Sequence, residues 1–87
     1  MRRVARTDAN HAAIREALRL AGHTVHDCSR YGGGFPDLLV RTRRRTLKLL
    51  EVKHPREGAT PIQAEFMARF PETVVVRTID EALKACQ

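Results

Sequence analysis

The sequence predicts a small α/β domain in which three helices and four strands follow one another in the order αβββαβα. Three observations lead to this prediction. Apolar residues recur at helical spacing near the N-terminus, short runs rich in Leu and Val are bounded by turn residues, and two threonines stand where later helices would begin. The 87 residues are enough for a single domain, which we place over residues 1–87.

The first predicted helix begins at Thr7 or Asp8, either of which is a suitable N-cap, and ends near Ala21. The apolar stripe of this helix has the spacing of a buried helix face and consists of Ile14, Ala17, Leu18 and Ala21. Gly22 follows at the position where glycine commonly ends a helix. A first strand is expected over residues 23–29, and a glycine-rich loop follows it.

The next two strands are expected to form a hairpin around an arginine-rich turn. The first contains residues 38–40 and the second contains residues 47–50. If the turn is centred on Arg44, paired residues lie equally far from Arg44 along the chain. Asp37 then lies opposite Glu51, with Cβ atoms roughly 4.5–5.5 Å apart.

The second half of the chain predicts two more helices with a strand between them. Thr60 is suited to cap a helix that has Pro61 at its first position. The expected buried face of this helix consists of Ile62, Phe66 and Phe70. A fourth strand is expected over residues 73–77, and the last helix is expected to begin with a capping box formed by Thr78 and Glu81.

Charged residues stand inside or beside the apolar runs of the predicted hairpin. Asp37 precedes the first strand, and Glu51 and Lys53 close the second. Because side chains alternate along a strand, Lys53 is expected on the same face as Glu51. Two carboxylates and one ammonium then converge on one patch, where burial costs free energy unless a partner compensates the charges. Carboxylate oxygens of this kind favour Mg²⁺ or Mn²⁺ over zinc.

Each of these charges also has a structural interpretation. Asp37 after Pro36 is typical of a turn. Glu51 and Lys53 are also typical of a charge pair on an edge strand, where charges oppose aggregation. The expected apposition of Asp37 and Glu51 across the hairpin favours a functional site over both interpretations.

The motif around these charges resembles that of a known nuclease superfamily. Pro36 and Asp37, followed by Glu51, Val52 and Lys53, are similar to the signature of the PD-(D/E)XK nucleases. The resemblance narrows to small stand-alone VRR-NUC proteins of phages and bacteria, which are related to Holliday-junction resolvases, through segments 32–40, 49–53 and 60–66. It covers nearly the whole chain.

The resemblance implies a restriction-endonuclease-like mixed sheet flanked by helices, and the activity of a divalent-metal-dependent DNA endonuclease selective for branched DNA. It implies that the carboxylates of Asp37 and Glu51 and the backbone carbonyl of Val52 bind Mg²⁺, for which Mn²⁺ can substitute. Lys53 is implied to position the attacking water or to stabilise charge on the phosphate. No small-molecule cofactor is expected.

Two positions complicate the match. Gln63 is implied to face the catalytic site, yet Thr60 and Gln63 also have the spacing of a capping box. Many relatives carry a glutamate on the first helix that faces the metal, and Ala13 occupies that position here. His11 and Glu16 lie nearby in the sequence but not at the same position.

Two segments are candidate DNA contacts. The loop before Asp37 supplies Ser29, Arg30, Tyr31 and Gly33. A hydroxyl in this loop is suited to phosphate, the tyrosine to an unpaired base, and the glycine to close backbone approach; a flexible connector with Tyr31 in the core is the alternative. The hairpin turn supplies Arg43, Arg44 and Arg45, which would either contact a neighbouring phosphate or be solvated.

The net charge of +6 and a pI near 10.4 favour a polyanionic partner, most simply DNA. Cutting both strands of a branched duplex requires two sites, so a homodimer is expected. No apolar run is long enough for a transmembrane helix or a secretory signal. Cys28 and Cys86 lack metal-ligand spacing, which is typical of reduced cysteines in a cytoplasmic protein, here of a bacterial cell or encoded by a phage.

Two other functions fit the sequence. The first is a less selective nicking or restriction-like nuclease. The second is a catalytically degenerate DNA-binding module of nuclease fold, which the alanine at position 13 favours. The intact Asp37, Glu51 and Lys53 argue against the second function, because two apposed carboxylates repel a phosphate when no metal ion lies between them.

Overall fold

The computed structural model describes residues 6–87, and of residues 6–8 it describes the backbone alone. Its elements follow the predicted order αβββαβα: α1 Arg6–Leu20, β1 Thr24–Asp27, β2 Leu38–Arg41, β3 Leu47–Val52, α2 Pro61–Arg69, β4 Val74–Val76 and α3 Ile79–Ala85. The chain is already helical at Arg6, so Thr7 and Asp8 lie inside α1 and the predicted cap at either residue is wrong.

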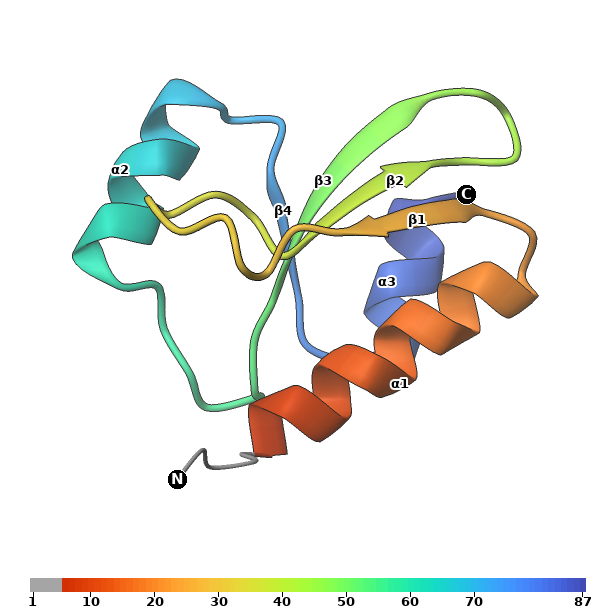
Figure 1. The fold of residues 1–87 in the computed structure, drawn as a ribbon, viewed down its shortest axis with the longest axis horizontal. Coiled ribbons are helices and arrows are strands. Elements are labelled where there is room, and N and C mark those ends of the chain that lie inside the picture. The colour runs from red at the N-terminus through yellow and green to blue at the C-terminus, as the bar shows by residue number, and fades with distance from the viewer. Residues whose placement is uncertain (1–5) are drawn as a thin grey trace.

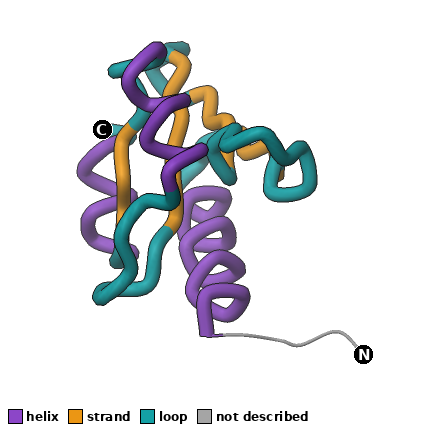
Figure 2. The backbone as a smooth tube through the Cα atoms, turned by 90° about the vertical axis from the view of Figure 1, so that its left-hand side faces the viewer, coloured by secondary structure: helices purple, strands orange, loops and turns teal. Residues whose placement is uncertain are grey.

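The four strands form one mixed sheet in the order β1-β2-β3-β4 (Figure 1). The first three strands are antiparallel, and β4 pairs with β3 in parallel after the crossover through α2. Figure 1 shows α1 and α3 together, with α2 apart from them across β3 and β4, and Figure 2 shows the same arrangement from the side. The mixed sheet predicted from the family resemblance is therefore confirmed.

The hydrophobic core lies between the sheet and the pair α1 and α3. Ile14 and Leu18 of the predicted helix stripe are completely buried, and they pack with a cluster that includes Val25, Leu38, Val40, Leu50, Val52, Val76, Ala82 and Cys86. The burial of these two helix residues fixes the rotation of α1 about its axis. It thereby decides which residues of the first turns of α1 face the end of the sheet.

The hairpin has the predicted register. Leu38 pairs with Leu50 and Arg41 pairs with Leu47, so partners lie equally far from Arg44. The turn is closed by hydrogen bonds from Thr42 N to Thr46 O at 2.8 Å and from Arg45 N to Thr42 O at 2.8 Å. Because β3 pairs with both β2 and β4, it is a central strand, and the edge-strand interpretation of its charges is wrong.

The predicted buried face of α2 is only partly correct. Phe66 is buried, but Ile62 is 57% exposed and Phe70 is 43% exposed. The reason is that Phe66 packs against Phe35 of the glycine-rich loop, with ring centroids 5.3 Å apart. The loop approaches α2 so closely that a Cβ atom at Gly34 would lie 2.6 Å from the carbonyl oxygen of Ile62.

The last helix begins at the predicted threonine but with a different partner for its glutamate. The Thr78 hydroxyl accepts a hydrogen bond from Glu81 N at 3.0 Å. The Glu81 carboxylate accepts from Arg77 N at 2.7 Å, one residue before the cap, so the capping box is only half formed. No helix within residues 6–87 has both the length and the apolar character needed to cross a membrane.

Candidate active site

A cleft of about 310 Å³ opens at the end of the sheet where β3 ends and β2 begins. Its lining includes Asp37, Glu51, Val52, Lys53 and Gln63, five positions that the sequence predicted for one site. Asn10 of α1 braces this end of the sheet, because its side-chain amide donates to the carbonyls of Lys53 at 3.1 Å and Arg77 at 3.2 Å. The hairpin register and the first turns of α1 and α2 therefore bring the predicted residues together.

Asp37 is held at the edge of this cleft by its side chain and by its backbone. Its Oδ2 accepts a hydrogen bond from Val52 N at 2.9 Å across the hairpin. Its carbonyl accepts from Cys28 N at 2.7 Å, which extends the β1–β2 ladder. Burial raises the pKa of this carboxyl, although the bond from Val52 and the nearby charges of His11 and Lys53 act in the opposite direction. Both the side chain and the backbone of Asp37 are thus fixed by neighbouring strands at the edge of the cleft.

Glu51 and Lys53 are the two buried charges of the site. Glu51 is 3% exposed and Lys53 is 4% exposed, and Lys53 Nζ lies 3.7 Å from Glu51 Oε2. Burial raises the pKa of Glu51 to about 7, and the neighbouring Asp37 carboxylate adds to the rise, while Lys53 lowers the pKa. One ammonium therefore only partly compensates two carboxylates, which is the condition in which an added cation would be bound favourably.

Gln63 links the two buried charges to the start of α2. Its side-chain nitrogen donates to Glu51 Oε2 at 2.9 Å, and its side-chain oxygen accepts from Lys53 Nζ. The same oxygen accepts from Thr60 N at 3.0 Å, and the Thr60 hydroxyl accepts from Gln63 N at 3.2 Å. The capping box and the contact with the site, which the sequence left as alternatives, are therefore both present.

Sequence reasoning gave no assigned role to two further residues that line the cleft, His11 and Glu57. The sequence did contain a signal for His11, because it lies three residues before Ile14 and seven before Leu18 and so extends the buried stripe of α1. Its Nε2 lies 3.6 Å from Asp27 Oδ2. Glu57 comes from the loop after β3, where its carboxylate accepts from His54 N at 2.8 Å, and no spacing pattern predicts it.

Asp27 at the end of β1 supports the cleft from outside. Burial alone would raise its pKa, but hydrogen bonds from Ser29 outweigh burial and, with His11 and Arg15, lower the pKa to about 2. The Arg15 guanidinium donates to Asp27 Oδ2 at 2.7 Å, and the Ser29 hydroxyl donates to Oδ1 at 2.6 Å. Asp27 therefore stays ionised and pairs with the Arg15 guanidinium of α1.

The donor set fits a magnesium-type ion that keeps several waters. Among the side chains of residues 9–87, no group of three or more His, Cys, Asp or Glu has a metal-binding arrangement. Ala13 and Glu16 of α1 are exposed, so neither supplies a carboxylate to the cleft. The chain offers two carboxylates, Asp37 and Glu51, and Mg²⁺ is commonly bound by one or two carboxylates while water and phosphate oxygens complete its shell.

No family model matches the sequence, and no curated protein matches it. A solved structure described as a VRR_NUC domain is similar, with 29% sequence identity and a TM-score of 0.64. The match covers 91% of this chain and 88% of that chain. The chain has the VRR-NUC fold. The resemblance predicted from the residues is thus confirmed, and the placement among PD-(D/E)XK proteins is consistent with it.

The VRR-NUC fold supports a nuclease-type domain, with DNA as its general substrate. Ser29, at the start of the loop between β1 and β2, lines the cleft. Arg30, Tyr31 and Gly33 continue the loop and are exposed, so the interpretation of Tyr31 as a core residue is wrong. Gly33 has a φ of 65° and open space around it, which permits close approach of another molecule.

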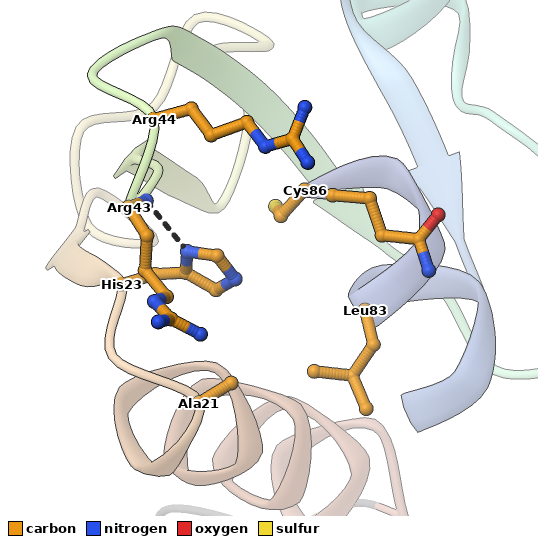
Figure 3. A pocket seen from close by; sticks show the side chains of 7 residues that line it. Ala21, His23, Arg43, Arg44, Leu83 and Cys86 are labelled. Carbon is orange, nitrogen blue, oxygen red and sulfur yellow. Dashed lines mark hydrogen bonds between the residues drawn. The ribbon is translucent and has the colours of Figure 1, made fainter.

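The three arginines of the hairpin turn lie at the other end of the VRR-NUC sheet. Six residues of β3 separate this turn from the cleft, a span of roughly 20 Å. Arg43, Arg44 and Arg45 are exposed. Figure 3 shows Arg43 and Arg44 beside a hollow of about 730 Å³ that His23, Leu83 and Cys86 also line. The structure therefore does not bring these arginines to the candidate site.

Proposed function

We propose that this domain is a divalent-metal-dependent DNA endonuclease that hydrolyses phosphodiester bonds. The observation that supports the proposal best is that the half-buried Asp37 and the buried Glu51 and Lys53 line one cleft within a VRR-NUC fold. A protein that only binds DNA gains nothing from two apposed carboxylates at its DNA-facing cleft, because they repel phosphate.

The residues that would hold Mg²⁺ or Mn²⁺ are Asp37 and Glu51 through their carboxylates and Val52 through its carbonyl. When bound, such an ion lowers the pKa of a water ligand and neutralises charge on the phosphate. Glu51 must be ionised for this role, and its pKa of about 7 makes proton release part of metal binding.

Lys53 and Gln63 have different roles in the proposed reaction. Lys53 places a fixed positive charge beside Glu51, where it orients the attacking water or stabilises charge that develops on the phosphate. Gln63 is a positioning residue, since its side-chain oxygen accepts from Lys53 and Thr60 and its side-chain nitrogen donates to Glu51. Water adds to phosphorus, one P–O bond of the backbone breaks, and the products are a phosphate monoester and a hydroxyl.

The DNA path follows from the positions of the exposed loop and turn. Ser29, Arg30 and Gly33 lie beside or near the cleft and would contact the backbone next to the cut phosphate. Arg44 and its neighbours, roughly 20 Å away along β3, would contact a phosphate farther along the duplex. We further propose that the substrate is branched duplex DNA and that a homodimer supplies the two sites that paired cuts require.

A second candidate function has one observation in its favour. Ala13 has no carboxylate and Glu16 is exposed, so neither of these two α1 residues supplies a ligand to the cleft, and a fold that has lost a ligand can keep DNA binding without cleavage. Retention of Asp37, Glu51 and Lys53 at one cleft favours the enzyme, because Glu51 is paired with Lys53 and Asp37 is hydrogen-bonded to the backbone of Val52 between them.

The deciding experiment is a cleavage panel. Purified protein and its Asp37→Asn variant are incubated with labelled four-way junction, splayed-arm, linear duplex and single-stranded DNA, with Mg²⁺, Mn²⁺ or EDTA. Paired cuts in the junction that disappear in EDTA and in the variant would support the full proposal. Equal cutting of all duplexes would retain the nuclease and reject junction selectivity. Tight binding without cutting under any condition would favour the binding module.

A further inference from the structure

A row of aromatic rings joins α2 to the exposed glycine-rich loop. Ring centroids are 4.6 Å apart for Phe66 and Phe70, 5.3 Å for Phe35 and Phe66, and 5.5 Å for Tyr31 and Phe35. Phe66 is buried and anchors the row. Tyr31, at the loop end, is 60% exposed. The exposed ring of Tyr31 is therefore packed on a row of rings that extends to the buried Phe66.

The ring of Tyr31 is also fixed at its hydroxyl end. Tyr31 Oη and His26 Nε2 are hydrogen-bonded at 2.7 Å, and the two rings meet edge to face at an interplanar angle of 64°. Contact with Phe35 and the bond to His26 restrict rotation about both side-chain torsions. An aromatic ring that is exposed yet already ordered loses little conformational entropy when a ligand stacks on it.

The loop leaves room beside this ring and connects it to the cleft. Cβ atoms at Gly32 or Gly33 would meet nothing within 4 Å. Tyr31 N donates to Cys28 O at 3.0 Å, and Cys28 N donates to the carbonyl of Asp37. Tyr31 is thus two hydrogen bonds from a residue of the candidate site, and the exposed Arg30 precedes it.

We propose that Tyr31 is a stacking platform for an unpaired nucleobase of the DNA, next to the phosphate that enters the cleft. This inference rests on the proposed function, because it assumes that the domain binds DNA. Stacking on an aromatic ring is tolerant of base identity, and bases inside an intact duplex are already stacked on one another. The platform therefore selects DNA with unpaired nucleotides close to the cut, as at a branch point or a frayed end.

The test measures binding in EDTA, so that it does not depend on cleavage. Two short single strands are compared by fluorescence anisotropy, one of thymidylates and one of abasic sites with the same number of phosphates. The intact protein should bind the thymidylate strand about tenfold more tightly, as expected for one stacked base. Tyr31→Ala should remove this preference and leave affinity for the abasic strand unchanged.

Two further variants keep the test decisive. Tyr31→Phe should retain most of the preference, and Tyr31→Leu, which preserves apolar packing on Phe35 if the alanine variant does not fold, should lose it. Phe70→Ala, which removes the exposed ring at the other end of the row, should keep the preference. A preference that persists in Tyr31→Leu, or equal binding of both strands by the intact protein, would overturn the proposal. Base preference without any cleavage would instead reject the nuclease and leave the platform intact.

Discussion

The two ends of the β2–β3 hairpin carry similar numbers of charges in opposite environments. At the cleft end, Glu51 and Lys53 are almost completely buried, and each is bonded to Gln63. At the turn end, Arg43, Arg44 and Arg45 are exposed. Burial of charge must be compensated by fixed partners, whereas exposed charge is solvated and costs little. The charges at the cleft end are therefore suited to chemistry at fixed positions, whereas the arginines at the turn end attract a polyanion without fixed contacts.

The energetic difference is visible in Glu51. The rise of its pKa from 4.5 to about 7 means that the folded protein destabilises the ionised form of Glu51 by roughly 3 kcal/mol relative to a freely solvated glutamate. The exposed arginines of the turn are in contact with water. A cation bound beside Glu51 would stabilise the ionised carboxylate, and we therefore expect the free energy lost by burial of this charge to be recovered when the cation binds.

The largest effect is expected from removing the charge of one carboxylate at the cleft. Asp37→Asn preserves an oxygen that accepts from Val52 N but removes the charge, and cleavage should fall roughly 10³-fold, since metal stabilisation of the transition state amounts to several kcal/mol. Asp80→Asn, at an exposed position of α3, is the matched control and should cleave normally. Equal activity of the two variants in single-turnover assays would contradict a catalytic role for the Asp37 carboxylate.

The next effect is expected from the buried ammonium. Lys53→Met should lower the rate of cleavage by roughly 10²–10³-fold, as for other groups that stabilise developing charge, while DNA affinity changes little. The variant should also unfold at a lower temperature, because Glu51 loses its oppositely charged neighbour. The exposed Lys84→Met should show neither change. A Lys53→Met variant with a normal single-turnover rate would show that the ammonium is only structural.

An intermediate effect is expected from pH on metal stabilisation. Because the pKa of Glu51 is raised in the folded state, this group stabilises the metal-free protein below about pH 4.5, and that contribution is lost as pH rises through about 7. A divalent cation binds the ionised form. Saturating Mg²⁺ should therefore raise the melting temperature more at about pH 8 than at about pH 5.5. Equal shifts at both pH values, or equal shifts in Asp37→Asn, would contradict this linkage.

The smallest effect is expected from the hairpin turn. The double variant Arg43→Gln with Arg44→Gln should weaken DNA binding a few-fold and reduce the salt slope of binding by up to about two. Arg45 is left unchanged because its φ is 69°, a conformation that most side chains adopt with strain. The single-turnover rate at saturating DNA should not change. Arg69→Gln, at the end of α2, is the control for charge alone.

Most of the fold was predictable because local signals agreed with one another. The turn centred on Arg44 fixed the hairpin register, and that register placed Asp37 and Glu51 at one cleft. Thr60 and Pro61 marked the start of α2 correctly. These features depend on neighbours in sequence or on one hairpin, so the residues themselves specify them.

The remaining features depend on tertiary packing. Ile62 and Phe70 satisfy the helix pattern but are exposed, because the glycine-rich loop rather than the sheet covers Phe66. His11 faces the cleft through the rotation of α1, which Ile14 sets by its burial against the sheet. Single-sequence patterns do not specify which loop covers a helix or how far a helix rotates.

The most direct test of the account is a titration with Mn²⁺ followed by electron paramagnetic resonance at about pH 8, without DNA. The intact protein and Asp80→Asn should bind Mn²⁺ with the same affinity. Asp37→Asn should bind it roughly 100-fold more weakly, because a direct ligand has lost its charge. Unchanged affinity in Asp37→Asn, or no binding by the intact protein, would show that the two carboxylates of the cleft are not a metal site.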